Sequence, residues 1–577
     1  MTEITIGLDK FNEPKKEDTL KPISKETGKQ VNAHELAKKQ RDISIAEFFE
    51  KNRHLLGFDN KRKALLTTIK EAVDNSLDAC DESGIIPEIE IVITDMGNDR
   101  FRISIEDNGP GIVKAQIPKI FAKLLYGSKF HSLRQSRGQQ GIGISASVMY
   151  GQLTTGRPAK ITSKIGADYP AHYYELKIDT QQNKPEIVKD EIKEWSKSHG
   201  TRIVLDLEGT YLKGAQSVDE YLKETAIINP HATLIYVNPK GEQIIFPRAT
   251  EEKPFQPEEI KPHPYGVELG MLIKMLNWTT EKTVKTFLQK EFSRVGAKTA
   301  NEILEQAFIP DNTKPAKVSR EMAEKLIESI RKTKIMSPPT DCISPIGAHL
   351  LEKGLKKEVN AEFYTSVTRS PDVYRGNPFI IEAALAYGGL LQSEGSIKIM
   401  RFANKVPLLY QQGACAMTES IVKTSWKGYG LQQSGKNMPQ GPCVILLHIA
   451  SVWVPFTSEA KEAIAHYPEI IKEIKLALQE LGRNLYRYVA KKRKVKDEMK
   501  KRSHIEKYIP HVASALKELL NYSDVEEQNV IEELENLLEK QRGEVESIEF
   551  DAKKNVEYDE EFANIGKEDK TDDVNEE

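Results

Sequence analysis

Glu71-Ala72-Val73-Asp74-Asn75 lies in the middle of residues 61–82, a segment that contains neither glycine nor proline. Apolar residues recur through this segment every three or four positions, which predicts an amphipathic helix. We expect its buried stripe to contain Leu65, Ile69, Val73, Leu77 and Cys80. Glu71, Asn75 and Asp78 share the face beside that stripe. This face is either an ordinary solvated surface or part of a catalytic site. In such a site the Glu71 carboxylate would take a proton from water, and the Asn75 amide oxygen, one turn away, would bind a hard cation.

A second polar stretch, Asp107-Asn108-Gly109-Pro110-Gly111, directly follows an apolar run at 101–106. That run and residues 89–94 predict two strands joined at Gly97-Asn98. The polar stretch is typical of a simple turn. Alternatively, Asp107 accepts a hydrogen bond from an exocyclic amine such as that of adenine, and the two glycines let a flat ring approach the backbone.

The third motif is a glycine loop, Arg137-Gly138-Gln139-Gln140-Gly141-Ile142-Gly143-Ile144, ahead of a predicted helix at 143–149. Such a loop presents free backbone N–H groups and a helix N-terminus to phosphate, although it can also be purely structural. It is neither a Walker loop nor a Rossmann fingerprint, because no Gly-Lys-Ser/Thr follows and the glycine spacing is reversed. Gly200-Thr201, at the start of a predicted strand at 202–207, is a fourth and weaker signal.

Composition narrows the class of protein. The 577 residues accommodate roughly four domains of about 150 residues each. Lys and Arg number 83 and Asp and Glu 86, which excludes a uniformly basic nucleic-acid coat but allows a local basic patch. Four distant cysteines without a Cys-x-x-Cys pair argue against a disulfide framework or zinc site and fit a reducing compartment. No apolar run reaches the ~20 residues of a membrane span, so we expect a soluble, cytoplasmic protein with no membrane partner.

The order of predicted elements divides the chain into five parts. Residues 1–42 are polar and lysine-rich, and we expect a disordered extension. A mixed sheet with helices is predicted for residues 43–255, and short helices only for residues 265–336. Strands followed by a long helix are predicted for residues 337–520, and a helical and then acidic extension for residues 521–577. Further expected elements are helices at 43–58, at 117–125 and from 458 into the 490s, and strands at 160–163, 173–178, 379–386, 397–402 and 443–454.

The four motifs, in this order, resemble the ATP-binding fold shared by gyrase, ATP-clamp chaperones, histidine kinases and MutL, the GHKL or Bergerat fold. Ser128 to Gly143 and Trp426-Lys427-Gly428-Tyr429-Gly430 resemble more closely the B subunits of archaeal-type DNA topoisomerase VI, over about residues 43–520. The resemblance implies an α+β multidomain protein: a GHKL ATPase α/β sandwich at 43–255, a helix–two-turn–helix domain at 265–336, and an α/β transducer with a long C-terminal helix at 337–520.

The resemblance also implies roles for single residues. Glu71 would be the general base for the attacking water, Asn75 a Mg²⁺ ligand, and Lys427 a catalytic contact from the transducer to the γ-phosphate of ATP. A lysine on another domain makes domain geometry depend on ATP versus ADP, because it contacts only a terminal phosphate that is present. The implied nucleotide-binding residues are Asn75, Asp107, Gly109, Gly111, Ser128, Lys129, Arg137, Gly138, Gln139, Gln140, Gly141, Ile142, Gly143, Ile144, Thr201 and Lys427.

Implied partners are a second copy of the chain on ATP binding, double-stranded DNA, and the separate A subunit of topoisomerase VI, which cleaves DNA, in an assembly of two A and two B subunits. The chain contains no Asp-x-Asp, so the metal cluster needed for strand cleavage is expected in the A subunit. Residues 483–502 hold ten basic and two acidic residues, with Tyr486 and Tyr488 interleaved. They predict either a DNA-contacting helix face or, alternatively, a solvated face or a protein contact. The alternatives are a chaperone-like clamp and a MutL-like mismatch-repair ATPase; a histidine kinase leaves the large regions after the ATPase without a role.

Overall fold

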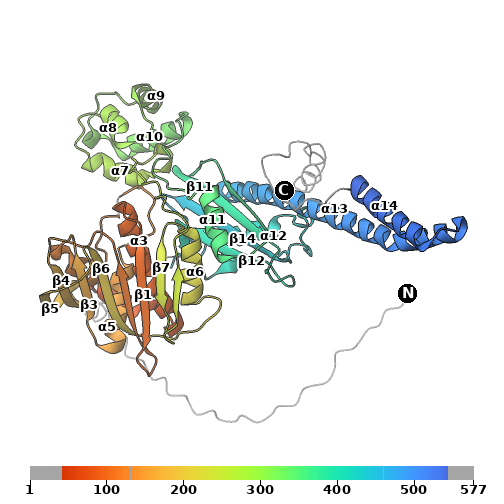
Figure 1. Ribbon diagram of the computed structural model, residues 1–577. Coiled ribbons are helices and arrows are strands. Elements are labelled where there is room, and N and C mark those ends of the chain that lie inside the picture. The colour runs from red at the N-terminus through yellow and green to blue at the C-terminus, as the bar shows by residue number, and fades with distance from the viewer. Residues whose placement is uncertain (1–41, 130–131, 139–140, 459, 543–577) are drawn as a thin grey trace, which may run out of the picture. The chain divides into compact units, whose positions relative to one another are not determined.

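The computed structural model describes residues 42–129, 132–138, 141–458 and 460–542. The expectations for the extension at 1–41, for Gln139 and Gln140, and for the tail at 543–577 lie outside the described residues. Every element discussed below belongs to the compact unit that begins at Ile45 (Figure 1).

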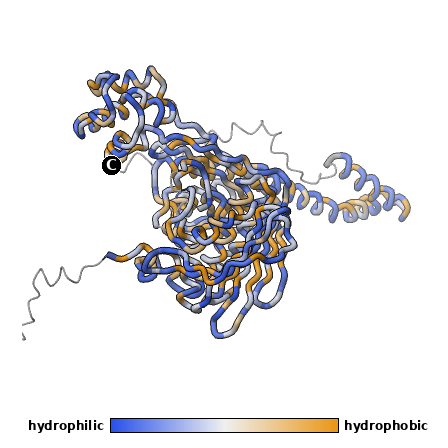
Figure 2. Tube along the Cα trace, turned by 90° about the vertical axis from the view of Figure 1, so that its left-hand side faces the viewer, coloured by the Kyte–Doolittle hydropathy of each residue, from blue (hydrophilic) through white to orange (hydrophobic). Residues whose placement is uncertain are grey.

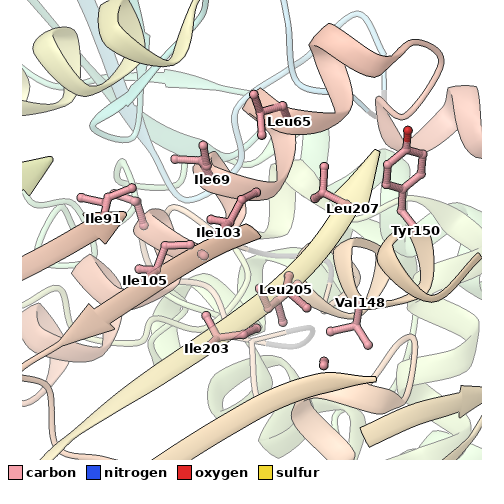
Figure 3. Packing of buried hydrophobic residues seen from close by; sticks show 14 of the residues in the cluster. Leu65, Ile69, Ile91, Ile103, Ile105, Val148, Tyr150, Ile203, Leu205 and Leu207 are labelled. Atoms are coloured by element: carbon pink, nitrogen blue, oxygen red, sulfur yellow. The ribbon is translucent and has the colours of Figure 1, made fainter. Parts of the chain in front are cut away.

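Helix α3, Lys61–Glu82, has the bounds that the sequence predicts. Asn60 caps it, because the Asn60 side chain accepts a hydrogen bond from the backbone N–H of Lys63 at 2.8 Å. The predicted stripe is confirmed, since its five members are all at most 1% exposed: Leu65, Ile69, Val73, Leu77 and Cys80. In Figure 3, Leu65 and Ile69 point from α3 toward the isoleucines of the sheet beneath.

The first sheet is mixed and has the strand order β5-β4-β3-β6-β2-β1-β7-β8. Neighbours are antiparallel except β1 and β7, which run parallel. The strands are β1 Glu88–Asp95, β2 Arg100–Asp107, β3 Ala159–Lys164, β4 Ala171–Asp179, β5 Lys184–Lys193, β6 Gly200–Glu208, β7 Thr233–Val237 and β8 Gln243–Phe246.

The five strands predicted in this region are confirmed, each with a slightly longer span. The sequence analysis missed β5, β7 and β8. Strand β5 lies at the edge of the sheet and is mostly exposed and charged, so its sequence lacks the apolar alternation of a half-buried strand. Edge strands of this kind are stabilised by pairing with one neighbour rather than by a buried face.

Helices α3, α5 Gly143–Thr155 and α6 Val218–Ile228 pack on the sheet and on one another to form a single core. Alternate residues of β2 and β6 face this core, and Val148 and Tyr150 meet them from α5 (Figure 3). The layer of helices on a sheet is the expected α/β sandwich. Hydrophobic residues concentrate inside the packed layers, and hydrophilic residues dominate the outer turns (Figure 2).

Two predicted helices of this region have different bounds. The expected helix at 43–58 is wrong as one piece: it is α2 Ile45–Lys51 followed by a short 3-10 helix η1 Arg53–Leu56. Asn52 breaks it with a non-helical φ of −118° and ψ of 48°, and Gly57 ends η1 in the left-handed region. Helix α4, Ile117–Ala122, is shorter than predicted, whereas α5 is longer.

The helices between the two sheets have a hydrophobic core of their own. They are α7 Leu269–Trp278, α8 Val284–Glu291, α9 Ala297–Ala307 and α10 Arg320–Lys332, with 3-10 turns η3 Pro264–Gly266 and η4 Pro315–Lys317. Side chains cap α8 and α10 at Thr283 and Ser319. The predicted all-helical pattern is therefore confirmed.

The second sheet has the order β10-β11-β14-β12-β13, with β9 paired to β11. Its strands are β9 Phe363–Thr368, β10 Asp372–Tyr374, β11 Asn377–Tyr387, β12 Lys398–Ala403, β13 Val406–Pro407 and β14 Cys443–Ser451. The three predicted strands correspond to β11, β12 and β14. Residues of β14 are buried throughout, because helices cover both faces of this sheet.

The two faces of the second sheet pack against different partners. One face, with Leu385 and Ile445, packs on α13, Pro468–Leu520. The other, with Ala384 and Leu446, packs on α11, Ala348–Glu358, and on Ile227 and Ile228 at the end of α6. The sheet is therefore joined to the first region through the helix α6 (Figure 1).

The long helix begins ten residues later than predicted. Residues 460–467 lie outside any helix, and α13 starts at Pro468, which suits the first turn of a helix because it has no N–H to leave unpaired. Helix α14, Asp524–Arg542, packs back against α13 (Figure 1). Tyr488 is 7% exposed and stacks on Phe363 with ring centroids 4.5 Å apart, so this tyrosine packs into the core beneath α13.

The remaining short elements are η2 Lys114–Gln116, η5 Gln412–Ala414, α12 Ala416–Lys423 and η6 Lys427–Tyr429. Across the described ranges, no helix is both long and apolar enough to cross a bilayer.

Candidate functional site

A cavity of about 830 Å³ lies beside α3. Its wall comes from α3, the end of β2, the start of β6, the glycine loop, and two segments of the second-sheet region, 407–410 and 460–462. The predicted site residues that line it are Glu71, Asn75, Asp107, Gly111, Ser128, Lys129, Gly138, Gly141, Ile142, Gly143, Ile144 and Thr201.

Asp107 closes the end of the cavity that is formed by strand termini. Its carboxylate accepts hydrogen bonds from the backbone N–H of Gly109 at 2.9 Å and of Thr201 at 3.1 Å, and from the Ser76 hydroxyl at 2.8 Å. Burial raises the pKa of Asp107, and these hydrogen bonds oppose the rise. Three donors from three elements therefore fix a 6% exposed carboxylate at the cavity wall.

The predicted glycines at this end have distinct functions. Gly109 does not line the cavity, but its N–H orients Asp107. Gly111 has a φ of +71°, and a Cβ there would lie 2.1 Å from the carbonyl oxygen of Lys164, so only glycine fits. Thr201 pairs with Asp107 in the register of β2 and β6, and its hydroxyl lies 3.0 Å from that of Ser163.

Glu71 and the start of α5 form a second part of the cavity wall, the loop end. A Cβ on Gly143 would lie 1.7 Å from Oε2 of Glu71, so glycine lets the first turn of α5 approach the carboxylate directly. The N-terminal turn of a helix has unpaired N–H groups and favours negative charge. Glu71 therefore lies beside a backbone surface that suits an anionic ligand.

Lys129 and Arg137 both bind Asp78, one turn along α3 from Asn75. Lys129 Nζ lies 2.6 Å from Asp78 and 2.9 Å from Glu82. Burial alone raises the pKa of Asp78, but Lys129 and Arg137 outweigh that effect and hold the pKa below its ordinary value. These ion pairs fix the glycine loop to α3 at one margin of the cavity.

Arg137 does not line the large cavity. Its guanidinium is buried and donates to Asp78 at 2.9 Å, to Asp81 at 2.8 Å and to Asn229 at 2.5 Å. The adjoining backbone is tied to the second-sheet region, because Asn404 donates to the Ser136 carbonyl at 3.2 Å. Arg137 therefore links the glycine loop to the remainder of the protein rather than facing the open cavity.

Asn75 is the predicted residue whose chemistry fits a divalent cation. It is exposed at the cavity wall, one turn from Glu71, and its amide offers a hard oxygen ligand. No group of three or more His, Cys, Asp or Glu that could hold a metal exists within the described ranges.

Lys427 lies outside the cavity. It is on η6, where it lines a separate, open pocket with Arg493. The lysine that reaches the cavity from the second-sheet region is Lys461, in the loop between β14 and α13. Glu71 and Lys461 line the same cavity. Burial lowers the pKa of Lys461, and the negative charge of Glu71 opposes that change.

Ser76 and Lys461 are two lining residues with a role in the site that were not predicted from the sequence, for different reasons. Ser76 falls on the apolar stripe of α3, and a lone polar residue there was a readable signal. Lys461 was assigned to a helix that begins at Pro468 instead; the proline was the signal for the true start.

The chain matches two family profiles. Residues 60–208 match "Histidine kinase-, DNA gyrase B-, and HSP90-like ATPase", which covers α3, Asp107, the glycine loop and Thr201. Residues 338–501 match "Topoisomerase VI B subunit, transducer", which covers the second sheet and Lys461. The first match shows a nucleotide-binding GHKL fold.

Relatives that share one description, the B subunit of type 2 DNA topoisomerase 6, extend over most of the chain. The relative from Methanococcoides burtonii is 54% identical, over 85% of this chain and 79% of the relative. That of Methanosarcina acetivorans is 52% identical over 86% and 80%, and that of Archaeoglobus fulgidus 48% identical over 87% and 84%. With this identity, this coverage and both family profiles, the chain belongs to the family of topoisomerase VI B subunits.

Proposed function

We propose that the chain binds and hydrolyses ATP as the B subunit of a type IIB DNA topoisomerase. The observation that carries the proposal is the convergence on one cavity of Glu71, Asp107 and the glycine loop with Lys461 from the second-sheet region. Membership of the topoisomerase VI B family supports it. The residue roles below belong to the same proposal.

At the strand end, Asp107 accepts a hydrogen bond from the adenine amine. Its carboxylate is already oriented by Ser76, Gly109 and Thr201, so little reorganisation is needed on binding. Gly111 lets the turn after Asp107 pack directly against the Lys164 carbonyl, which fixes the backbone beside the adenine site.

At the other end, the N-terminus of α5 and the glycine loop bind the phosphates through backbone N–H groups. Ser128 and Lys129 stand at the margin of the same space. Glu71 accepts a proton from the attacking water as general base. Asn75 holds Mg²⁺, which neutralises phosphate charge and orients the phosphates when bound.

Lys461 contacts the terminal phosphate in this proposal, a role that the sequence analysis gave to Lys427. The contact exists with ATP and is lost with ADP, so the loop that carries Lys461 is held in the cavity by one nucleotide and released by the other. Hydrolysis then changes the relation between the ATPase and transducer regions.

The chain acts with partners. ATP binding dimerises it, and two copies assemble with two A subunits, which cleave DNA, to pass one duplex through a break in another, relaxing positive and negative supercoils and decatenating DNA. Lys491, Lys492, Arg493 and Lys494 form an exposed basic stretch of α13 that suits a phosphate backbone. Replacing all four with glutamine is expected to weaken DNA-stimulated ATP hydrolysis, and an unchanged dependence on DNA concentration would contradict this.

The deciding experiment mixes the chain with its candidate A subunit, ATP, Mg²⁺ and supercoiled plasmid. The expected result is relaxed circles that require all components. Stimulation of ATP hydrolysis by unfolded protein but not by duplex DNA would favour a chaperone-like clamp instead. Stimulation only by a mispair-recognising partner would favour a MutL-like clamp.

A further inference from the structure

Lys63 and Glu462 form an ion pair between the first turn of α3 and the loop that carries Lys461. Lys63 Nζ lies 2.5 Å from Glu462 Oε1 and 3.3 Å from Asp59 Oδ1. The Lys63 and Glu462 side chains are 16% and 8% exposed, respectively. A pair this sheltered is screened far less than a surface ion pair, and removing one partner leaves a poorly solvated charge.

Tyr410 shelters the same contact. Its ring centroid lies 5.2 Å from Lys63 Nζ, in cation–π range, and Tyr410 belongs to the segment that follows β13. Burial disfavours the charged form of Lys63, but Glu462 and Asp59 outweigh it and raise the pKa of Lys63. Lys63 is therefore held as a cation against two segments of the second-sheet region.

The chain between β14 and α13 folds back as a hairpin, and Lys461 lies between its two arms. Phe456 and Ile464 form a bridge, and the Thr457 N–H donates to the Ala463 carbonyl at 2.9 Å. Ala463 and Ile464 are fully buried, which fixes the returning arm of the hairpin. Lys461 has a φ of +53°, a left-handed conformation that a non-glycine residue adopts only when its surroundings impose it.

One rigid helix carries both the partner of Glu462 and the general base. Lys63 and Glu71 are eight residues apart on α3, or about 12 Å along its axis. Glu462 directly follows Lys461 in the chain, so fixing Glu462 at residue 63 fixes the backbone from which Lys461 extends toward Glu71. The geometry links two neighbouring hairpin residues to two points on α3.

We propose that the Lys63–Glu462 ion pair positions Lys461 in the cavity, which makes Lys63 and Glu462 positioning residues for the ATP-dependent step. This inference rests on the proposed function, in which Lys461 contacts the terminal phosphate. Breaking the pair frees the hairpin tip and weakens the response to ATP, but leaves the strand end of the cavity intact.

The test uses the full chain and four variants: Lys63→Glu, Glu462→Lys, the double charge reversal, and Lys61→Glu as a matched control. Lys61 also lies on the first turn of α3, but it pairs with Asp99 and Glu208 of the first region. The Asn60 cap uses the backbone N–H of Lys63, so it survives substitution of the side chain. Kinetics of ATP hydrolysis and affinities for ADP and a non-hydrolysable ATP analogue are measured.

Each single reversal is expected to lower kcat about tenfold and to reduce the preference for the ATP analogue over ADP, with ADP affinity unchanged. The double reversal is expected to recover part of the loss; recovery is incomplete because Asp59 also faces residue 63. Lys61→Glu is expected to behave like the unmodified chain.

The inference would be overturned if both single reversals kept the unmodified kcat and ATP preference. It would also be overturned if the double reversal had no higher kcat and no stronger ATP preference than the single reversals. If the reversals unfold the chain, Lys63→Met and Glu462→Gln provide the same comparison without a repulsive charge. Lys461→Ala separates the two proposals. If this variant keeps the preference for the ATP analogue over ADP, the proposed function of Lys461 is wrong. If it loses that preference while the Lys63 and Glu462 variants behave like the unmodified chain, only the positioning role is wrong.

Discussion

The two ends of the cavity are built in different ways. At the strand end, Asp107 is fixed by donors on α3, on β6 and in its own turn, all within the first region. At the loop end, Glu71 faces α5 and the hairpin of Lys461, which belongs to the second-sheet region. A ligand held at the strand end requires one folded domain, whereas chemistry at the loop end requires two regions in contact.

Two lysines of the second-sheet region also differ: Lys461 lines the cavity, and Lys427 does not. Trp426, next to Lys427, is fully buried, and its indole N–H donates to the Ile421 carbonyl at 2.8 Å. The tryptophan thus fixes a local turn, and Lys427 lies on the outer side of that turn near Arg493. Lys461 lacks so recognisable a neighbour, yet it lines the same cavity as Glu71.

The largest effect is expected from Glu71→Gln, at the loop end. Hydrolysis should fall by about 10²–10⁴-fold, the usual worth of general-base help, while nucleotide still binds because the strand end is unchanged. Single-turnover hydrolysis and equilibrium nucleotide binding measure the two properties separately. Glu328→Gln, on the exposed face of α10, is the control; normal turnover in Glu71→Gln would remove the assignment of the base.

Lys461→Ala and Lys427→Ala test separately the loop end of the cavity and the outer turn that carries Lys427. Loss of a positive group at a transferring phosphate is expected to lower kcat by about 10²-fold for Lys461→Ala. Lys427→Ala is expected to stay close to the unmodified rate, because Lys427 does not line the cavity. Steady-state ATP hydrolysis at saturating ATP measures both, and the reverse ranking would return the phosphate contact to Lys427.

Asp107→Asn perturbs the strand end instead. It replaces an oriented acceptor by an amide, and loss of a charge-assisted hydrogen bond is expected to weaken nucleotide affinity by about 10- to 100-fold. The loss should be equal for ADP and an ATP analogue, because both carry adenine. Titration calorimetry with the two nucleotides checks this, and a loss confined to the ATP analogue would contradict the proposed orientation.

The smallest expected effect is on the free energy of unfolding, through the buried carboxyl group of Asp74. Burial raises the pKa of Asp74 to about 7, Glu71 adds to the rise, and Lys70 and Arg137 oppose it. The unfolded chain ionises this group near its ordinary pKa of about 3.9, so the folded state holds an extra proton between about pH 4 and 7 and loses relative stability as pH rises through that window.

Asp74→Asn removes this dependence. Asparagine can still accept the hydrogen bond that Tyr221 donates to Asp74 at 2.9 Å. The variant is therefore expected to unfold at a higher temperature than the unmodified chain, with a larger gain at pH 8 than at pH 5. Thermal unfolding at the two pH values measures the gain, and a gain that is larger at pH 5 would show that Asp74 is ionised in the folded state.

Much of the fold could be predicted because its signals are local. The period of apolar residues and the asparagine cap specify α3 to the residue, and runs of apolar residues bounded by turns specify the central strands. Edge strand β5 and the non-helical residues 460–467 ahead of α13 were not placed in this way. The first lacks an apolar face, and the second follows a buried strand with residues that are compatible with a helix.

The sequence by itself determined the helix that carries Glu71 and Asn75, the turn that carries Asp107, and the glycines ahead of α5, because backbone hydrogen bonding and side-chain period act over a few residues. Only the tertiary structure decided that Arg137 turns into the contact with Asp78 and Asp81, and that Lys461 rather than Lys427 lines the cavity with Glu71. These contacts join residues up to hundreds of positions apart, and their geometry depends on how α6, α11 and the second sheet pack together. Packing of that kind has no local period in the sequence.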